Sequence, residues 1–343
     1  MFANLIGNQP AKLFVAKLLK QRRFPNAILF AGPDGVGKKA FALETARAFV
    51  CTKDGVEPCT ECAACDRAQR LNIPKPDKRD EFKEVIFTDH PDVGMVVPYN
   101  RNILVDAIRD LEKEARYRPF EAAARVFIID EADKMNDAAS NALLKTLEEP
   151  AASSHIILIS SRPDSLLPTI RSRCQMLRFA PVAAAEIEEH LVRNDVCSAE
   201  DAAFAARVAG GSVAKAKEAD VGKIRDARSA MLGLVGDALR HNIAPVLQTA
   251  ERMNDAKNKD DLEANLSILE GLIRDVWLWT NGGDASGLIN ADIAGELASF
   301  ATRAEAKVLA LWMEEIERLR EQFIVNINRK VATDALVVKM ARA

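Results

Sequence analysis

Short runs of consecutive apolar residues alternate, in the first half of the chain, with longer segments whose apolar positions recur every three or four residues. The short runs predict strands and the periodic segments predict helices. The predicted strands are Ile28–Ala31, Met95–Val97, Val126–Ile129, His155–Ile159 and Arg173–Phe179. The predicted helices include Gln9–Lys20, a segment ending near Cys51, one opening at Ile103, and Asn136–Leu147. Because each strand is apolar on both faces and helices lie between strands, the pattern predicts an α/β domain with a parallel sheet covered by helices.

The strand signal disappears after Pro181, where alanine-rich helical segments begin. Two long stripes of apolar residues at helical spacing then predict the core of a helical bundle. The stripes are Leu262, Leu266, Leu269, Ile273 and Val276, and Val308, Trp312, Ile316, Leu319 and Phe323. Gly210-Gly211 marks a break between helices. We therefore expect an α/β domain over 1–180, a small helical domain over 181–222 and a helical domain over 223–343.

The charge balance of 47 basic and 50 acidic residues gives a net charge of -3, which excludes a global basic surface for nucleic acid. Any contact with DNA must be local or shared with partner proteins. The 343 residues, 48% hydrophobic and 28% charged, exclude a disordered or fibrous chain. The N-terminus lacks a signal-peptide pattern, and no apolar run reaches the roughly 18 residues that cross a bilayer. We therefore expect a cytoplasmic protein without a membrane partner.

The first predicted strand runs into a glycine-rich segment with the pattern of a phosphate-binding loop. In G-x-x-x-x-G-K-[ST], backbone N–H groups surround phosphate oxygens, the lysine reaches the β- and γ-phosphates, and the final hydroxyl holds Mg²⁺. Gly32, Gly37 and Lys38 match, but Lys39 replaces the final Ser or Thr. An ammonium group cannot ligate a metal ion, so a nucleotide can bind but its hydrolysis should be impaired. The candidate nucleotide-binding residues are Gly32, Pro33, Gly35, Gly37, Lys38 and Lys39.

Asp130 and Glu131 follow a predicted strand and form the second half of a nucleotide site. An aspartate at the carboxyl end of a buried strand can hold Mg²⁺, and the next glutamate can polarise the attacking water. The alternative is a solvated loop, and the phosphate-binding loop upstream favours the nucleotide site. Glu131 has little to do if Lys39 excludes the metal, so we interpret both carboxylates as vestigial. Ser160 and Ser161, after the next strand, are weaker candidates for sensing a γ-phosphate.

Four of the six cysteines lie close together, at Cys51, Cys59, Cys62 and Cys65, with the spacing C-x₇-C-x₂-C-x₂-C. Four thiolates suit a tetrahedral structural zinc ion and leave no open position for catalysis. A reducing compartment keeps thiols available as ligands, which favours a metal over disulfides. The alternative is a set of free or redox-active thiols. We predict a zinc module over residues 51–65.

Two arginines lie just before the last predicted strand, in the segment Thr169–Cys174. Arg173 can project outward, and its planar guanidinium suits the γ-phosphate of a nucleotide bound by a neighbouring subunit. The alternative, which the isolated motif favours, is a surface ion pair at the start of a strand.

Several of these segments, taken in order, resemble the subunits of bacterial clamp loaders, which are members of the AAA+ family. The segments that carry the resemblance are Asn26–Phe30, the Gly32–Lys38 loop, the four-cysteine insertion, His90–Asp92, Ile129–Met135, Leu144–Pro150 and Ser172–Cys174. The resemblance extends along the whole chain and weakens after Ala180. Leu144–Pro150 together with Ser172–Cys174 is its most specific part.

The resemblance implies an AAA+ domain, a small helical lid and a helical collar that builds a ring of subunits. It implies that the ring, as part of the DNA polymerase III holoenzyme, loads the sliding clamp on primed DNA, with delta and the gamma/tau motor subunits as partners. Arg173 would then complete the ATP site of an adjacent motor subunit, and Lys39 would suit a stator that does not hydrolyse ATP. The lid also departs from that of a motor, because Gly211–Lys215 contains no arginine to sense a γ-phosphate.

Two other functions compete with the stator. A self-sufficient ATPase motor of the same family would have to hydrolyse ATP in spite of Lys39. A helicase would use Asp130–Asp133 as its signature, but it needs a complete phosphate loop and a second α/β domain, and the helical second half provides neither. We expect the stator, and the sequence leaves open whether the chain itself binds a nucleotide.

Overall fold

The computed structural model describes residues 2, 5–53, 56–254, 261–323 and 327–343. Parts of three predictions therefore lie outside the described residues, namely 1 and 3–4 of the α/β domain, 54–55 of the zinc module, and 255–260 and 324–326 of the last helical domain. The chain divides into two compact units, Met1–Asn194 with Gly211–Lys215, and Asp195–Gly210 with Ala216–Ala343. The division into three domains, with boundaries after 180 and 222, remains a prediction.

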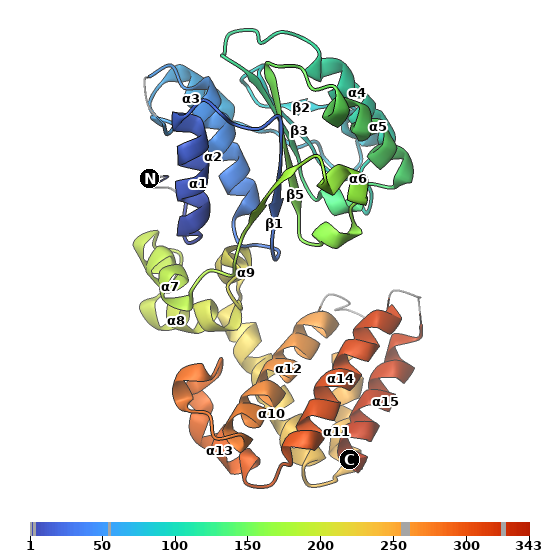
Figure 1. The fold of residues 1–343 in the computed structure, drawn as a ribbon. Helices are drawn as coiled ribbons and strands as arrows, with labels where there is room; N and C mark the ends of the chain where they lie inside the picture. Colours follow the sequence, from blue (N-terminus) through green and yellow to red (C-terminus); the bar gives the residue numbers. More distant parts are fainter. Residues whose placement is uncertain (1, 3–4, 54–55, 255–260, 324–326) are drawn as a thin grey trace. The chain divides into compact units, whose positions relative to one another are not determined.

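A six-stranded sheet forms the centre of the first unit, with the strand order β2-β3-β4-β5-β1-β6 (Figure 1). The strands are β1 (Ala27–Ala31), β2 (Ile86–Phe87), β3 (Val93–Val96), β4 (Arg125–Ile129), β5 (Ser154–Ser160) and β6 (Gln175–Arg178). All neighbouring strands are parallel except β2 and β3. The predicted parallel sheet is confirmed. The antiparallel strand β2 was not predicted, because two residues are too short to show a period.

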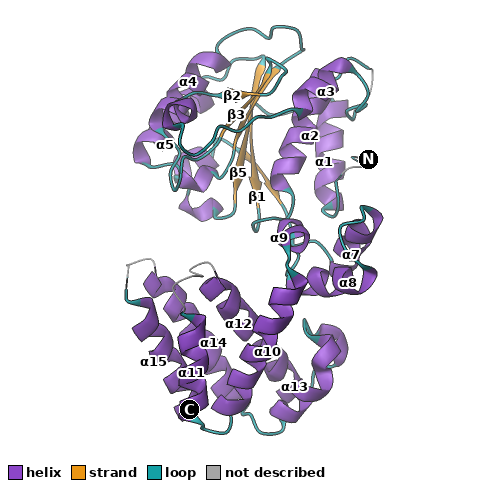
Figure 2. Cartoon of the chain, turned by 180° about the vertical axis from the view of Figure 1, so that it is seen from behind, coloured by secondary structure: helices purple, strands orange, loops and turns teal. Residues whose placement is uncertain are grey.

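Helices cover both faces of this sheet, with α1, α2 and α3 on one side and α4, α5 and α6 on the other, and Figure 2 shows the same layers from behind. Successive residues of β1 point to opposite layers, since Ile28 and Phe30 pack with α1 and α2 whereas Leu29 packs with α4 and α5. The helices of this unit are α1 (Gln9–Lys20), α2 (Lys38–Val50), α3 (Ala63–Gln69), α4 (Val105–Ala115), α5 (Asp137–Glu148), α6 (Pro168–Arg171) and α7 (Ala184–Arg193).

The strand order brings three loops together at the carboxyl edge of the sheet. β5 lies between β4 and β1, with Ile129 beside Leu158 and Ala31 beside Ser160. The loops that leave these three strands therefore begin next to one another. Gly32 N–H, the first donor after β1, is bonded to the carbonyl of Ser160 at 3.2 Å.

The second unit is helical, and the two predicted stripes lie in its core. All five residues of the Leu262–Val276 stripe are at most 4% exposed, and Trp312, Ile316 and Leu319 of the other stripe are equally buried. The helices are α8 (Ala199–Val208), α10 (Val221–Ala238), α11 (Ile243–Met253), α12 (Asp261–Thr280), α13 (Ala294–Ala301), α14 (Ala306–Phe323) and α15 (Arg329–Arg342), and α9 (Val213–Glu218) contributes residues to both units. Among the described helices, none is long and apolar enough to cross a membrane.

A buried ion pair, Asp92 with Arg125, fixes the entry to β4. Both side chains are at most 1% exposed, and Arg125 Nε lies 3.6 Å from Asp92 Oδ1. The Asp92 carboxylate also accepts hydrogen bonds of 2.8 to 3.0 Å from the backbone N–H groups of residues 120–122. Burial alone would raise the pKa of Asp92, but these donors outweigh it, and the pKa is lowered. In the folded chain the Asp92 carboxylate is therefore charged, and both of its oxygens accept hydrogen bonds.

Asp92→Ala should lower the free energy of unfolding by about 3 to 5 kcal/mol, because it removes one partner of a buried ion pair and three backbone N–H groups lose their acceptor. Urea unfolding followed by circular dichroism measures the change. Asp89→Ala, three residues earlier on the surface, is the control and should change the free energy by less than about 0.5 kcal/mol.

The difference between wild type and Asp92→Ala should also depend on pH. Since the folded pKa of Asp92 lies below its unfolded value, the stabilisation is complete above about pH 4 and is lost as the pH falls through the folded pKa. A difference that grows on acidification would contradict this assignment.

Candidate functional site

The glycine-rich segment forms the turn between β1 and α2 at the carboxyl edge of the sheet. Gly35 has φ 75° and Gly37 has φ 97°, in the left-handed region that side chains rarely adopt. Gly37 directly precedes the first residue of α2. The backbone thus turns from strand to helix at Gly37, which the phosphate-loop pattern specifies, and at Gly35, a position that the pattern leaves open. Ligand binding by this loop remains a prediction.

The Lys38 ammonium is turned back onto the loop that carries it. Its Nζ donates to the carbonyl oxygens of Gly32 at 2.5 Å and Pro33 at 2.6 Å, and its side chain is only 5% exposed. Burial lowers the pKa of Lys38, against the opposing attraction of Asp34 and Asp130. The carbonyls of the loop therefore satisfy the group that would contact a nucleotide's phosphates.

Lys39, the residue that departs from the phosphate-loop pattern, forms an ion pair with Asp130. Its Nζ lies 2.9 Å from Oδ2 of Asp130, whose side chain is 13% exposed. An aspartate in this place helps to hold Mg²⁺ in nucleotide hydrolases. Here a cation of the chain itself already lies against the carboxylate, and a second cation beside it would be strongly repelled in a partly buried site. The pair therefore disfavours a magnesium ion at Asp130, and exclusion of the metal remains a prediction.

Glu131 is likewise engaged by a lysine, because its carboxylate pairs with Lys134. Its backbone has φ 47°, a left-handed conformation that is uncommon for residues other than glycine. The side chain of Asp130 caps this turn, since its Oδ1 accepts the Glu131 N–H at 3.1 Å. Each candidate catalytic carboxylate is thus paired with a lysine, Asp130 with Lys39 of the helix that follows the phosphate loop and Glu131 with Lys134. Their catalytic role remains a prediction.

The candidate γ-phosphate sensors, Ser160 and Ser161, donate hydrogen bonds to an aspartate of the same chain. Ser160 Oγ donates to Asp133 Oδ1 at 2.9 Å, and the Ser161 N–H donates to the same oxygen at 3.3 Å. Arg162 pairs with the other oxygen of Asp133 at 3.2 Å. Burial would raise the pKa of Asp133, but the donors Ser160 and Arg162 outweigh it and lower the pKa. These groups tie the ends of β4 and β5 together.

The segment Gly211–Lys215 lies against the phosphate loop. The Ala214 N–H donates to the Gly35 carbonyl at 3.2 Å, and a Cβ atom added to Gly35 would come within 2.0 Å of Ser212 Oγ. Ser212 is 5% exposed, and its Oγ accepts the Lys215 N–H at 3.3 Å. Two constraints therefore require glycine at position 35, namely the left-handed backbone and the lack of space for a side chain beside Ser212.

Arg173 lies at the opposite edge of the sheet from the phosphate loop. It precedes β6, which runs parallel to β1, so it is at the amino end of the strands. Its side chain is 35% exposed and borders a pocket of about 450 Å³ that is also lined by Pro25, Leu147 and Pro150. Strands of this length span roughly 15 Å. Arg173 is thus separated from the phosphate loop of its own chain.

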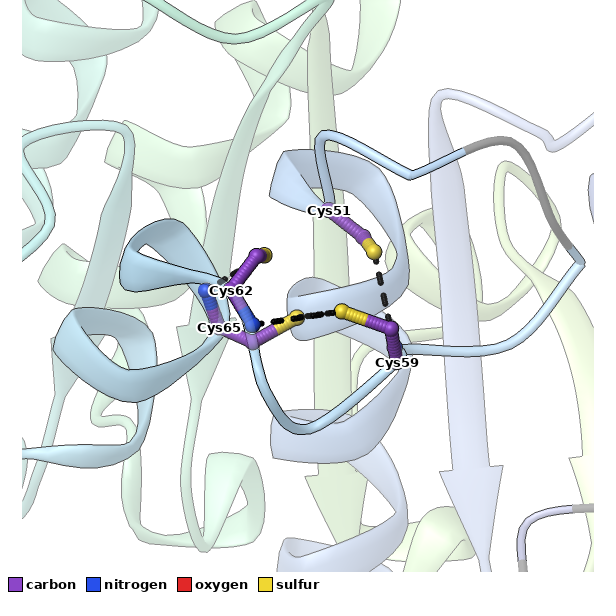
Figure 3. Close-up of side chains that lie close together, drawn as sticks. All are labelled: Cys51, Cys59, Cys62 and Cys65. Carbon is purple, nitrogen blue, oxygen red and sulfur yellow. Dashed lines mark hydrogen bonds between the residues drawn. The ribbon is translucent and has the colours of Figure 1, made fainter.

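The four clustered cysteines meet between the end of α2 and the start of α3 (Figure 3). Their sulfur atoms all lie within 4.8 Å of one another, so they can hold a metal ion. Backbone N–H groups point at three sulfurs at 3.3 to 3.4 Å, which stabilises thiolates. Burial raises the pKa of Cys65 to about 12, whereas at Cys62 the N–H donors outweigh burial and lower the pKa to about 5.

Sequence reasoning missed three contacts of the candidate site residues. It predicted that Lys39 would exclude a metal but not that Asp130 would be its partner, and it did not place Ser212 against Gly35. A third is the pairing of Arg173 with Glu148, at 2.8 Å. For the two ion pairs, only the unlike charges were visible in the sequence, and they gave no indication of which residues pair. For Ser212 and Gly35 the sequence contained no signal.

Comparison with known families gives two matches that together cover most of the chain. Residues 7–183 match the family model described as DNA polymerase III, delta subunit. Residues 227–337 match the model described as DNA polymerase III, delta subunit, C terminal.

Individual relatives include subunits of two kinds. A DNA polymerase III subunit delta' of Bacillus subtilis is 36% identical over 178 residues, covering 52% of this chain and 49% of that protein. The subunit tau of the same organism is 30% identical over 283 residues, covering 78% of this chain and 46% of tau. A subunit delta' of Pseudomonas aeruginosa is 30% identical over 332 residues, covering 92% of both chains. The match thus spans about half the length of the first two relatives and nearly all of the third.

Lys39→Thr should create Mg²⁺-dependent nucleotide binding, because it frees Asp130 and supplies the missing hydroxyl. We expect ATP to bind the variant at least about tenfold more tightly with Mg²⁺ than with EDTA, and the wild type to show no gain with Mg²⁺. Isothermal titration calorimetry measures both affinities.

Lys39→Met is the matched control, since it removes the charge without adding a metal ligand. It should gain less from Mg²⁺ than Lys39→Thr does. Equal Mg²⁺ dependence of the wild type and Lys39→Thr would show that the ion pair does not control the site.

Proposed function

Because the chain belongs to the delta' subunit family of DNA polymerase III, we propose that it is the stator subunit of a bacterial clamp loader. In this role it helps to load the sliding clamp on primed DNA during replication. It hydrolyses no ATP itself and supplies Arg173 to the ATP of a neighbouring motor subunit. Its partners are the delta subunit, the gamma/tau motor subunits and the clamp, with DNA contacted through the assembled complex in the cytoplasm.

The observation that carries this proposal is the ion pair between Lys39 and Asp130. A motor needs Mg²⁺ to bridge the phosphates and neutralise their developing charge, and the pair leaves no place for it at Asp130. A subunit that does not bind the metal can still supply the Arg173 guanidinium to the ATP site of a neighbouring subunit. Such a group would act as an arginine finger, which stabilises transition-state charge on a phosphate bound by another chain.

The position of Arg173 supports action on another chain. The guanidinium is partly exposed and lies at the amino edge of the sheet, away from the phosphate loop of its own chain at the carboxyl edge. This position supports a contact of Arg173 with a nucleotide bound by an adjacent subunit. The contact with Glu148 is the surface ion pair that the alternative interpretation expected, and the two roles are compatible because most of the guanidinium's donors remain free for a phosphate.

The second candidate is a self-sufficient motor of the gamma/tau kind. The likeness to the Bacillus subtilis tau, at 30% identity, shows that overall similarity alone does not separate the two roles. The ion pair at Lys39 favours the stator. ATP hydrolysis by the purified chain at the rate of a competent ATPase would establish the motor instead.

The cysteine cluster is assigned to a structural zinc ion. Four sulfurs with peptide N–H donors suit Zn²⁺, and a site filled by protein ligands has no open position for a reacting molecule. The metal would join α2 to α3 and stabilise a part of the chain with few buried apolar residues of its own. When bound, it would have no catalytic role.

Elemental analysis of the purified protein should find one zinc ion per chain. Replacing Cys62 and Cys65 together by Ser should abolish the zinc, because two of four ligands are lost. Cys197→Ser, at a half-buried cysteine in the other unit, should leave the zinc content unchanged. Metal-free protein after anaerobic purification would refute the assignment.

Arg173→Ala should leave folding and ring assembly intact and lower the clamp- and DNA-stimulated ATPase of the reconstituted complex. The expected loss at the affected site is on the order of 10³-fold, the magnitude typical of an arginine finger. Steady-state phosphate release in the complex measures it.

Arg171→Ala is the control for this variant. Arg171 lies two residues away and pairs with Asp164 of the same surface segment. It should keep near wild-type activity. Full activity of the complex carrying Arg173→Ala would overturn the proposed role.

A further inference from the structure

The Arg173 guanidinium is held by acceptors from two different helices. Nη2 lies 2.8 Å from Oε1 of Glu148, the last residue of α5, and Nη1 donates to the carbonyl of Thr169 in α6 at 2.9 Å. An arginine side chain has many rotamers, and two fixed acceptors on separate elements select one of them. The guanidinium is therefore ordered before any partner arrives.

We propose that Glu148 is a positioning residue for Arg173, an inference that rests on the proposed function of this chain. Glu148 does not touch the neighbour's nucleotide in this proposal. It acts through the guanidinium, holding it in the orientation in which its remaining N–H donors face the adjacent subunit. A group held in place before the reaction loses less freedom in the transition state, so its contribution appears in the rate of the chemical step.

Arg173 keeps free N–H donors with which it can bind a phosphate while it contacts Glu148. A guanidinium has five N–H donors, and the contacts with Glu148 and Thr169 engage only Nη1 and Nη2, with a hydrogen left on each as well as the one on Nε. The side chain is 35% exposed, so a phosphate can reach these donors. Glu148 can thus keep its hydrogen bond while Arg173 binds an anion.

Neighbouring charged residues lack this arrangement. Arg171 pairs with Asp164 on the same surface segment, and within the described part of the chain no ion pair joins it to α5. Glu149 follows Glu148 directly and is exposed, and among the described residues its side chain contacts no charged partner. Glu149 therefore offers a control of equal charge one residue away.

Two substitutions separate the hydrogen bond of Glu148 from its charge. Glu148→Gln keeps an oxygen acceptor for Nη2 and removes the negative charge, whereas Glu148→Ala removes both. If the hydrogen bond positions the guanidinium, Gln restores the activity that Ala loses. If the carboxylate acts only through its charge, Gln behaves like Ala.

The test uses the complete complex of this chain with its motor and delta subunits, assayed with ATP, the sliding clamp and primed DNA. Glu148→Ala should lower kcat by about 10- to 100-fold with little change in KM, as expected for a misplaced catalytic group. Glu148→Gln and Glu149→Ala should stay close to wild type. Adding Glu148→Ala to Arg173→Ala should cause no further loss, because the two residues act as one unit.

The outcomes distinguish this inference from the proposed function. If Arg173→Ala lowers activity but Glu148→Ala does not, the positioning role is wrong and the stator role stands. If Arg173→Ala has no effect, the stator role fails. Equal losses for Glu148→Ala and Glu149→Ala, or a Gln variant as weak as Ala, also overturn the positioning role. Gel filtration and circular dichroism of each complex confirm that the variants fold and assemble.

Discussion

The ion pair between Lys39 and Asp130 is the interaction on which the account of this protein depends. In a nucleotide hydrolase these two positions hold a hydroxyl and a carboxylate around a magnesium ion. Here an ammonium group lies 2.9 Å from the carboxylate, so the charge that the metal would provide is supplied by the chain itself. The turn between β1 and α2 is thereby kept, and we propose that the pair prevents ATP hydrolysis at this site.

In the rest of the site, polar groups of the phosphate loop are hydrogen-bonded to other groups of the same chain. Lys38 is bonded to the carbonyls of Gly32 and Pro33, and Gly35 accepts a hydrogen bond from Ala214. Of these groups, the Lys38 ammonium is a donor that a phosphate would otherwise engage, whereas the contact at Gly35 uses only the backbone carbonyl. Arg173, the proposed arginine finger, lies at the other edge of the sheet, where it is held by α5 and α6. The phosphate loop and Arg173 thus lie at opposite edges of the parallel sheet.

Much of this was predictable from local sequence patterns. Consecutive apolar residues gave the parallel strands, helical periodicity gave the buried stripe from Leu262 to Val276, and the spacing of four cysteines indicated the cluster that the structure forms. What could not be predicted depends on pairing across long stretches of chain. Lys39 pairs with Asp130 because the sheet brings the ends of β1 and β4 close together. Arg173 pairs with Glu148 because the ends of α5 and α6 lie close together in the fold. A local sequence pattern shows which residues are charged, but it does not show which residues lie next to them in the fold.

The central claim is that a side-chain cation excludes the metal from this site. Anomalous diffraction from crystals of the chain soaked with Mn²⁺ and a non-hydrolysable ATP analogue tests it most directly. The account predicts no manganese peak at Asp130, with the Lys39 ammonium still within hydrogen-bonding distance of the carboxylate. A manganese ion coordinated by Asp130 and the nucleotide's phosphates would contradict it.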